Sequence, residues 1–367
     1  MRVRTLLLKG LAILLVFGLT LAAAEIIARL AFPGYSDDSQ YTQLVIERLM
    51  NSGLVAQNRG GDPKRFLGYT PNAVNTVVAP EYRYTMRTNS LGFRSKEIEA
   101  PRTGEFRVWL LGDSMFVGIG AQEEERIDVR LQEVGQRRSG GDLPSLSVFN
   151  FAVGGFNTAQ ELAVLRRFIE EVRPDEVVLG FFVANDVLPN ATVRVDEAGN
   201  YQVDSEKTQA LMAEVSEERP LLFIPSVVWR ILALNLYVPR LRYDFALKPE
   251  IMDRSFELLR QIQADCRKQG VALLVVVIYP RDGVRGGWLE AWLHSRAVGE
   301  KVVRFCRMQG IEVLDLLSVM NGSADAERLF FRKDGHLNPE GNRVVAEALY
   351  GEILASHLRP AAQAQRP

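Results

Sequence analysis

Four short polar motifs between residues 112 and 336 carry residue types that together could transfer an acyl group. That chemistry needs a nucleophile, a general base, a carboxylate that orients the base, and donors for the developing oxyanion. A serine, an Asp/His pair, two glycines and an asparagine amide could supply these parts. The motifs are Gly112-Asp113-Ser114, Gly154-Gly155, Asn185-Asp186 and Asp334-Gly335-His336. Alone, three of the motifs could be ordinary turns and the glycine pair could serve close helix–strand packing, so their place in the fold decides what they can do.

The elements that must position these motifs are five short apolar runs that read as buried strands. Amphipathic stretches that predict helices separate most of them. The runs are Phe106–Leu111, Leu146–Val153, Glu176–Val183, Val271–Ile278 and Ile311–Leu317. This alternation predicts an α/β domain with a five-stranded parallel sheet. Ligands bind at the carboxyl ends of such strands, and the first three runs lead into the serine, glycine and asparagine motifs.

Histidine is scarce in this chain, which narrows the search for a general base. The 367 residues include three histidines, and only His336 lies beside an aspartate in a predicted loop; the others are His294 and His357. Three scattered histidines and two cysteines offer a metal ion no ligand set, so we expect neither metal nor cofactor. Cys266 and Cys306 could be two independent apolar residues or one disulfide.

The composition is that of an ordinary globular protein. Hydrophobic residues make up 47% of the chain and charged residues 24%, which suits a sizeable buried core. Lysine and arginine (44) nearly cancel aspartate and glutamate (45), leaving a formal charge of −1. A nucleic-acid partner would call for a basic surplus, so we expect none.

The four motifs, in this order, resemble the sequence blocks of the SGNH/GDSL hydrolase family. The resemblance spans residues 106–357, and the segment Asn89–Arg94 is similar to the lead-in of membrane-anchored bacterial members. Val183 stands where the third block of the family usually has glycine. The last block is shorter than the usual Asp-x-x-His. This Asp-x-His form resembles members that act on cell-envelope polysaccharides, including acetyltransferase-like ones.

The resemblance implies a fold and a role for each motif residue. The fold would be a three-layer α/β/α sandwich of the flavodoxin-like SGNH type. Ser114 would be the nucleophile, His336 the base, and Asp334 the acid that orients it. The oxyanion hole would combine the N–H groups of Ser114 and Gly155 with the side-chain amide of Asn185. Asp113 is expected to brace the turn by hydrogen bonding.

The implied function is that of a serine esterase. The expected substrate is an acylated small molecule or glycan outside the cytoplasm, with O-acetyl groups of a cell-envelope glycan as the first choice. An O-acyltransferase of envelope polysaccharide could use the same triad. A glycan-binding protein that has lost catalysis is a further alternative. The sequence assigns no protein partner.

Residues 1–32 predict a membrane anchor or a signal segment. Arg2, Arg4 and Lys9 precede an uncharged run of 14 residues, Leu11–Ala24. Basic residues ahead of an apolar run predict a chain that leaves the cytoplasm. The apolar pattern continues to Phe32, which favours an uncleaved single-pass anchor in the inner (cytoplasmic) membrane, with the catalytic domain on the periplasmic side. A signal cut after Ala24 and a buried helix of a soluble protein are the alternatives.

The remaining boundaries follow changes of composition. Residues 33–104 form a polar lead-in, residues 105–358 the hydrolase domain, and residues 359–367 a tail predicted to be disordered. Residues 187–249 break the strand–helix rhythm and are predicted to be an insertion. Within this insertion, Leu221–Val238 is apolar except for Arg230 and Asn235. It is expected to pack on the sandwich as an extra helix, or to lie at the membrane surface or over the Ser114 rim.

Overall fold

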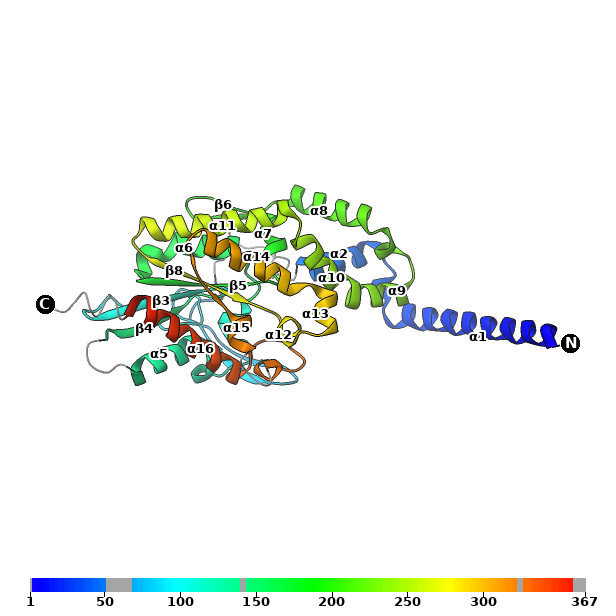
Figure 1. Ribbon diagram of the computed structural model, residues 1–367, viewed down its shortest axis with the longest axis horizontal. Coiled ribbons are helices and arrows are strands. Elements are labelled where there is room, and N and C mark those ends of the chain that lie inside the picture. The colour runs from blue at the N-terminus through cyan, green and yellow to red at the C-terminus, as the bar shows by residue number, and fades with distance from the viewer. Residues whose placement is uncertain (1, 51–67, 139–142, 322–325, 359–367) are drawn as a thin grey trace. The chain divides into compact units, whose positions relative to one another are not determined.

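The computed structural model describes residues 2–50, 68–138, 143–321 and 326–358 (Figure 1). The chain divides into two compact units. The smaller unit comprises Met1–Met50 and Ser205–Arg242, and the larger comprises Asn51–Asp204 and Tyr243–Pro367. All four polar motifs belong to the larger unit. The predicted tail, 359–367, lies outside the described residues.

The larger unit is built on one sheet of five parallel strands in the order β4-β3-β5-β8-β9. The strands are β3 (Glu105–Leu111), β4 (Ser145–Asn150), β5 (Glu176–Phe182), β8 (Ala272–Ile278) and β9 (Glu312–Asp315). Each falls on one of the five apolar runs. The three central strands β3, β5 and β8 are almost wholly buried, as expected for parallel strands covered on both faces. The predicted five-stranded parallel sheet is confirmed.

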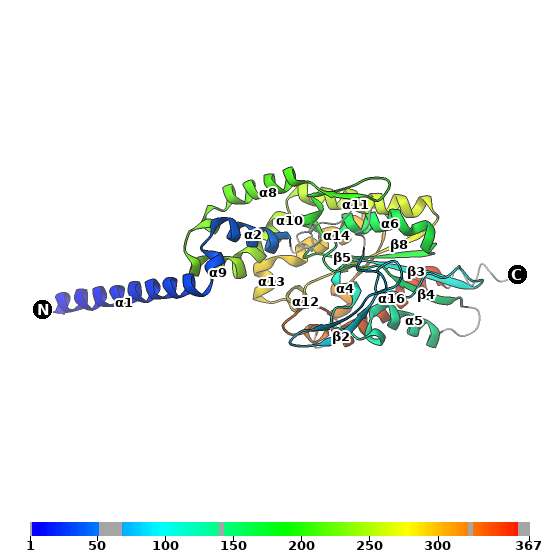
Figure 2. The same ribbon diagram turned by 180° about the vertical axis from the view of Figure 1, so that it is seen from behind.

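Helices cover both faces of this sheet. Figures 1 and 2 show α6, α11 and α14 on one side and α5 and α16 on the other, which makes the predicted three-layer sandwich. These helices are α5 (Ile127–Arg138), α6 (Thr158–Val172), α11 (Pro249–Lys268), α14 (Ser295–Met308) and α16 (Pro339–Ile353). Shorter helices follow the strands: α4 (Ser114–Val117), α7 (Val187–Asn190), α12 (Arg281–Arg285), α13 (Trp288–Leu293) and α15 (Leu316–Met320).

Side-chain caps and glycines set the ends of the long helices. The Asn157 side chain accepts hydrogen bonds from the second and third residues of α6, which fixes where that helix begins. Gly270 and Gly310 take φ values of 69° and 62° after α11 and α14, a left-handed conformation that suits glycine. The chain then reverses directly into β8 and β9.

Two antiparallel hairpins accompany the sheet. β1 (Val74–Val78) pairs with β2 (Arg83–Arg87) in the lead-in, where the alternating sequence of residues 82–88 is typical of a strand. β6 (Val193–Val195) pairs with β7 (Tyr201–Val203) after α7. β1 lacks a clear alternating pattern and was not predicted.

The smaller unit joins the start of the chain to the middle of the predicted insertion. It contains α1 (Arg2–Ala31), α2 (Asp38–Met50), α8 (Ser205–Glu218) and α9 (Val227–Leu232), followed by a π-helical turn, Ala233–Tyr237. Single turns of 3₁₀ helix occur at Pro33–Tyr35 and Pro220–Phe223. The next helix, α10 (Val238–Ala246), spans the boundary between the units. Within the described residues, one segment is long and apolar enough to cross a membrane, Lys9–Ala31 of α1.

The two cysteines are separate buried thiols. Cys266 lies in α11 and Cys306 in α14, and both are free. Burial raises the pKa of each thiol to about 12. They therefore act as small apolar residues and are poor nucleophiles at neutral pH.

Glu176, the first residue of β5, should make stability depend on pH. Its carboxyl group is buried, and this burial, reinforced by the nearby carboxylates of Glu312 and Asp175, raises its pKa from 4.5 to about 8. His357 Nε2 lies 3.9 Å from its Oε1. The folded state keeps a proton that the unfolded state loses above about pH 4.5. Stability should therefore fall as pH rises from about 4.5 to 8.

We expect Glu176→Gln to remove the loss of stability between about pH 4.5 and 8. The free energy of unfolding, measured by urea titration, should rise by on the order of 5 kcal/mol at pH 9 and change little at pH 4.5, since each pKa unit corresponds to about 1.4 kcal/mol. Glu171→Gln is the matched control, because Glu171 is exposed on α6. A gain of equal size at both pH values would contradict a titration effect.

Candidate active site

The serine motif sits where the buried strand β3 turns into a short helix. Asp113 precedes the helix α4, and its Oδ1 accepts a hydrogen bond from the Met115 N–H at 2.9 Å. Ser114 is the first residue of α4 and is partly exposed. The predicted bracing role of Asp113 agrees with this bond, which holds the turn that presents the Ser114 hydroxyl.

A chain of contacts joins Ser114 to the Asp/His motif, 222 residues later in the sequence. His336 Nε2 lies 2.8 Å from Ser114 Oγ. On the other side of the ring, His336 Nδ1 is hydrogen-bonded to Asp334 Oδ1. The side chains of His336 and Asp334 are 25% and 27% exposed, so the site opens to solvent. The structure thus brings serine, histidine and aspartate together in the order that a triad requires.

The loop that carries Asp334 and His336 is held by the turn between β1 and β2. Tyr82 donates its hydroxyl proton to Asp334 Oδ2 at 2.7 Å. The Glu81 carboxylate accepts the backbone N–H groups of three successive loop residues, at 2.5 to 3.0 Å: Arg332, Lys333 and Asp334. Gly335 has a φ of 85°, which allows the tight turn between Asp334 and His336.

The electrostatics of this loop favour an ionised Asp334. Its hydrogen bond to His336, and the further bond from Tyr82, lower its pKa to about 2 against the opposing effect of burial. The carboxylate therefore stays charged at any pH near neutrality. It can hold the imidazole in the tautomer with a proton on Nδ1, which leaves Nε2 free to accept a proton.

The glycine and asparagine motifs both lie against the serine turn. Gly155 has a φ of 78°. Asn185 donates from Nδ2 to Asp113 Oδ2 at 2.7 Å and to the Phe156 carbonyl at 3.3 Å. The asparagine predicted as an oxyanion donor thus bonds to the residues that follow Gly155 and precede Ser114. Both hydrogens of its amide have an acceptor in this structure.

Tyr69 is a site neighbour that sequence reasoning missed. Its hydroxyl oxygen accepts the N–H of Gly154 at 2.8 Å. Burial raises the pKa of Tyr69 to about 12, so the phenol keeps its proton. The bond fixes the glycine loop beside Ser114. A lone tyrosine in a polar segment, 85 residues before its partner, carries no pattern that could have revealed it.

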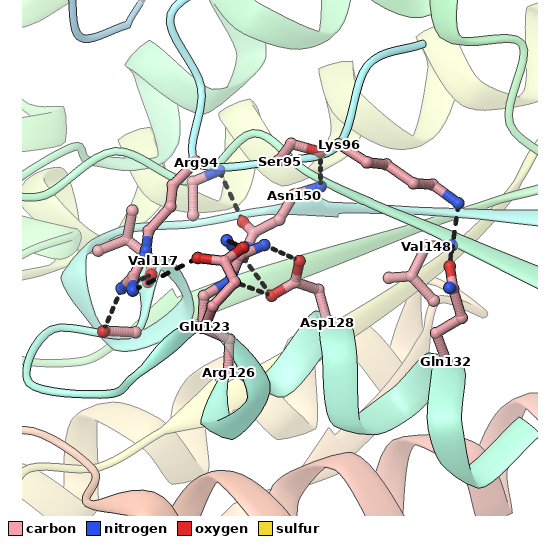
Figure 3. A network of polar contacts seen from close by, with 12 residues as sticks. Arg94, Ser95, Lys96, Val117, Glu123, Arg126, Asp128, Gln132, Val148 and Asn150 are labelled. Carbon is pink, nitrogen blue, oxygen red and sulfur yellow. Dashed lines mark hydrogen bonds and ion pairs between the residues drawn. The ribbon is translucent and has the colours of Figure 1, made fainter. Parts of the chain in front are cut away.

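Arg94, the last residue of the lead-in motif, holds the far end of α4. Its buried guanidinium donates to the carbonyls of Gly118 (2.7 Å), Ala121 (2.8 Å) and Val117 (3.3 Å). Figure 3 shows this side chain within a polar network that reaches the sheet at Asn150. Asn150 Nδ2 in turn donates to the Phe116 carbonyl at 2.8 Å. The helix that begins with Ser114 is therefore fixed at both ends.

Three carboxyl groups are buried close to the serine turn. Burial raises the pKa of Asp113 to about 6, opposed by its bonds from Met115 and Asn185. Burial also raises the pKa values of Glu161 and Asp186 well above their usual range, and repulsion among the three groups adds to the effect. Glu161 and Asp186 are thus favoured in their neutral, protonated forms at neutral pH.

The other sequence candidates lie elsewhere. His294 follows α13 with a φ of 63°, and His357 faces Glu312 at 3.3 Å. In the parts of the chain that the structure describes, histidine, cysteine, aspartate and glutamate form no group of three that could hold a metal ion.

A serine at the carboxyl end of a parallel strand, in contact with a His–Asp pair on a three-layer sandwich, is the arrangement of an ester hydrolase. The comparison with known families agrees. The chain belongs to the GDSL-like Lipase/Acylhydrolase family, whose model matches residues 110–344. The family resemblance of the sequence motifs is therefore confirmed, and the protein is an ester-bond hydrolase by family.

One curated relative and several solved structures are similar to this chain. A probable alginate O-acetylase, AlgJ of Pseudomonas aeruginosa, is 31% identical over 113 residues, which cover 29% of this chain and 28% of AlgJ. The chain thus matches less than a third of that relative's length. A lipase/acylhydrolase from Enterococcus faecalis is 14% identical, with a TM-score of 0.41, over 68% of this chain and 96% of its own. The esterase EstA from Pseudoalteromonas sp. is 13% identical, with a TM-score of 0.40, over 68% of this chain and 97% of EstA.

Proposed function

We propose that the protein is a serine esterase that removes O-acyl groups, O-acetyl groups above all, from an extracytoplasmic substrate such as a cell-envelope glycan. The observation that carries this proposal is the unbroken contact chain from Ser114 Oγ through both ring nitrogens of His336 to Asp334. Family membership supports the reaction class, and the contact chain supports the assignment of residues.

The reaction follows from the geometry. His336 Nε2 takes the Ser114 proton as Oγ attacks the ester carbonyl carbon, and a tetrahedral oxyanion forms. The C–O bond to the alcohol then breaks, and the imidazolium returns its proton to the departing oxygen. Water repeats the sequence on the acyl-serine: His336 accepts its proton, the acid leaves, and Ser114 regains its hydrogen. Asp334 remains a carboxylate throughout and stabilises the imidazolium.

The oxyanion would be stabilised by donors gathered around Ser114. Among the described residues, the backbone N–H groups of Ser114 and Gly155 have no protein acceptor, so both are available. Asn185 bonds closely to Asp113 and more weakly to the Phe156 carbonyl. We propose that the hydrogen in the longer bond turns to the oxyanion, while the bond to Asp113 keeps the amide in place. Loss of one such donor typically costs about 10²–10³ in turnover.

An O-acetylated glycan is the proposed substrate for two reasons. The stretch of similarity to AlgJ, a probable alginate O-acetylase, links this chain to acetyl chemistry on a polysaccharide. The partly exposed His336 and Asp334 place the reacting groups at an open surface, where a polymer can approach. A small acetyl group needs little space beside Ser114.

The same relative supports a second candidate, an O-acetyltransferase. Hydrolysis and transfer share the acyl-serine and differ in whether water or a sugar hydroxyl resolves it. The two are separated by supplying an acetyl donor with and without a deacetylated glycan. Transfer would move the acetyl group to the glycan, whereas an esterase would release acetate at the same rate in both reactions.

The proposed location follows from α1. Arg2, Arg4 and Lys9 precede the apolar part of this helix, and the candidate span ends at Ala31. We propose that α1 is retained as a single-pass anchor in the inner membrane, with both units on the periplasmic side. Basic residues at the start of the span favour this orientation.

The experiment that tests the assignment is labelling with a serine-directed fluorophosphonate. The wild-type protein should gain one phosphonyl group, located on Ser114 by peptide mass spectrometry. His336→Ala should label far more slowly, because the probe reacts with a serine that the imidazole activates. His357→Ala is the control and should label at the wild-type rate. Labelling of a different residue would overturn the proposal.

A further inference from the structure

The part of the insertion that belongs to the smaller unit exposes an unusual group of large apolar side chains. Five of them occur within 16 residues, with exposed fractions between 38% and 64%: Leu221, Ile224, Trp229, Leu232 and Leu236. We call these five residues the apolar face. Large exposed hydrophobic side chains that cluster in this way mark a contact with a partner or a membrane.

The five residues form one continuous surface. Trp229, Leu232 and Leu236 are spaced by three and four along α9 and the turn after it, so they share a helix face. Leu221 and Ile224 come from the turn that precedes α9. The Trp229 Nε1–H donates to the Leu221 carbonyl at 2.7 Å, which ties this turn to the helix.

The only charged residue in this segment, Arg230, is buried. Its guanidinium donates to the carbonyls of Tyr35 (2.8 Å) and Ile224 (3.1 Å) and to the carboxylate of Asp38. The guanidinium carbon of Arg230 also lies 4.7 Å from the centroid of the Tyr41 ring. The guanidinium itself is therefore removed from the surface and hydrogen-bonded, while its partner Asp38 stays exposed.

The segment is fastened directly to the helix that we propose as the membrane anchor. The Glu25 carboxylate accepts hydrogen bonds from the Ser226 hydroxyl (2.8 Å) and from the N–H groups of Val227 (2.9 Å) and Val228 (3.1 Å). One turn further along α1, Arg29 donates to the Pro225 carbonyl at 2.7 Å and pairs with Glu25. The start of α9 is thus joined to the last two turns of the candidate span.

The length of the anchor sets the depth of this junction. The uncharged part of α1 between Lys9 and Glu25 has 15 residues, or about 22 Å of helix. The hydrocarbon core of a bilayer is about 30 Å thick. Glu25 and the residues bound to it therefore lie at or just below the boundary between acyl chains and head groups. At that depth an apolar outer surface is favoured, and the Glu25 carboxylate is paired with Arg29 and hydrogen-bonded to the start of α9.

We propose that the apolar face is a second membrane contact, which lies in the head-group region of the bilayer beside the anchor. The inference rests on the proposed retention of α1 as a membrane span. An amphipathic helix with tryptophan on its apolar side binds such an interface. The contact adds apolar area next to a short span and restricts how the anchor can rotate and tilt.

The test uses the full-length protein in vesicles of phosphatidylethanolamine and phosphatidylglycerol. Leu232→Cys and Leu236→Cys are each labelled with the environment-sensitive fluorophore NBD; Cys266 and Cys306 are buried and should not react. We expect blue-shifted emission, a several-fold loss of quenching by aqueous iodide, and strong quenching by lipids that carry a nitroxide. Ser216→Cys on α8 is the control, because Ser216 is exposed in the same unit but outside the apolar face. Its label should be quenched by iodide alone.

A label at Leu15→Cys, within α1, separates the two hypotheses. If Leu15 is quenched by the lipid nitroxide while positions 232 and 236 respond to iodide like position 216, the anchor holds and the membrane contact is overturned. Shielding from iodide without quenching by lipid would show a protein partner, such as a second copy of this chain, and would also overturn it. A water-exposed label at Leu15 would overturn the anchor and the contact together. Ester hydrolysis in the same vesicles reports on the proposed activity separately.

Discussion

Ser114→Ala is expected to lower the turnover of a simple ester such as 4-nitrophenyl acetate by at least about 10⁴-fold, because it removes the nucleophile and leaves only the oxyanion donors. The substitution deletes one partly exposed oxygen whose hydrogen-bond partner, His336, can bind water in its place. The fold and the thermal midpoint should therefore change little. Steady-state kinetics and circular dichroism measure the two effects.

The matched control is Ser216→Ala, which removes an exposed hydroxyl from α8 in the smaller unit. This variant should keep full activity. If Ser114→Ala retained more than a few per cent of the wild-type rate, another group would be forming the acyl-enzyme and the assignment of Ser114 would be wrong.

Asp334→Asn should lower turnover by about 10²–10⁴-fold. The asparagine can present its amide nitrogen to His336 Nδ1, which favours the tautomer with a proton on Nε2, and that tautomer cannot accept the Ser114 proton. Because the Asp334 side chain is 27% exposed, water can replace part of its role, so the loss should be smaller than for Ser114→Ala. The effect should fall on kcat rather than on KM.

Tyr82→Phe is the matched control for Asp334. It removes the hydrogen bond to Asp334 Oδ2 but leaves the carboxylate and its contact with His336 in place. We expect a loss of less than about 10-fold, in line with one hydrogen bond to a charged group. Should Asp334→Asn prove as mild as Tyr82→Phe, a different carboxylate must orient the imidazole.

The sheet and the four motifs could be predicted because their signals are local. Short apolar runs such as Val271–Ile278, which alternate with amphipathic stretches, are typical of buried parallel strands, and parallel strands bring their carboxyl ends to one edge. Once the first three runs were assigned, Ser114, Gly155 and Asn185 had to converge. His336 followed because it is the one histidine beside an aspartate in a loop before the last helix.

The hydrogen bonds that hold the loops of the site and the start of α9 could not be predicted, since they join residues far apart in the chain. Tyr82 and Asp334 are separated by 252 residues, and Glu25 and Ser226 by 201. Nothing in the local pattern around Tyr82 or Glu25 indicates its partner, which is set by how segments far apart in the sequence pack together. The helix α2 was missed although its buried residues Tyr41, Val45 and Leu49 recur every fourth position, because the whole of residues 33–104 was interpreted as a polar lead-in.

Glu81 and Tyr82 bond to the Asp334 loop but lie outside the segment that matches the family. The site therefore depends on more of the chain than the family match covers. The match begins at residue 110, yet Tyr69, Glu81, Tyr82 and Arg94 all precede it and all hold parts of the site. A gene fragment cut at the signature's borders would encode Ser114, Asp334 and His336 without the upstream residues that hydrogen-bond to their loops. A truncated protein that is meant to stay active must therefore begin upstream of Tyr69. Substitutions in the lead-in should be expected to affect activity.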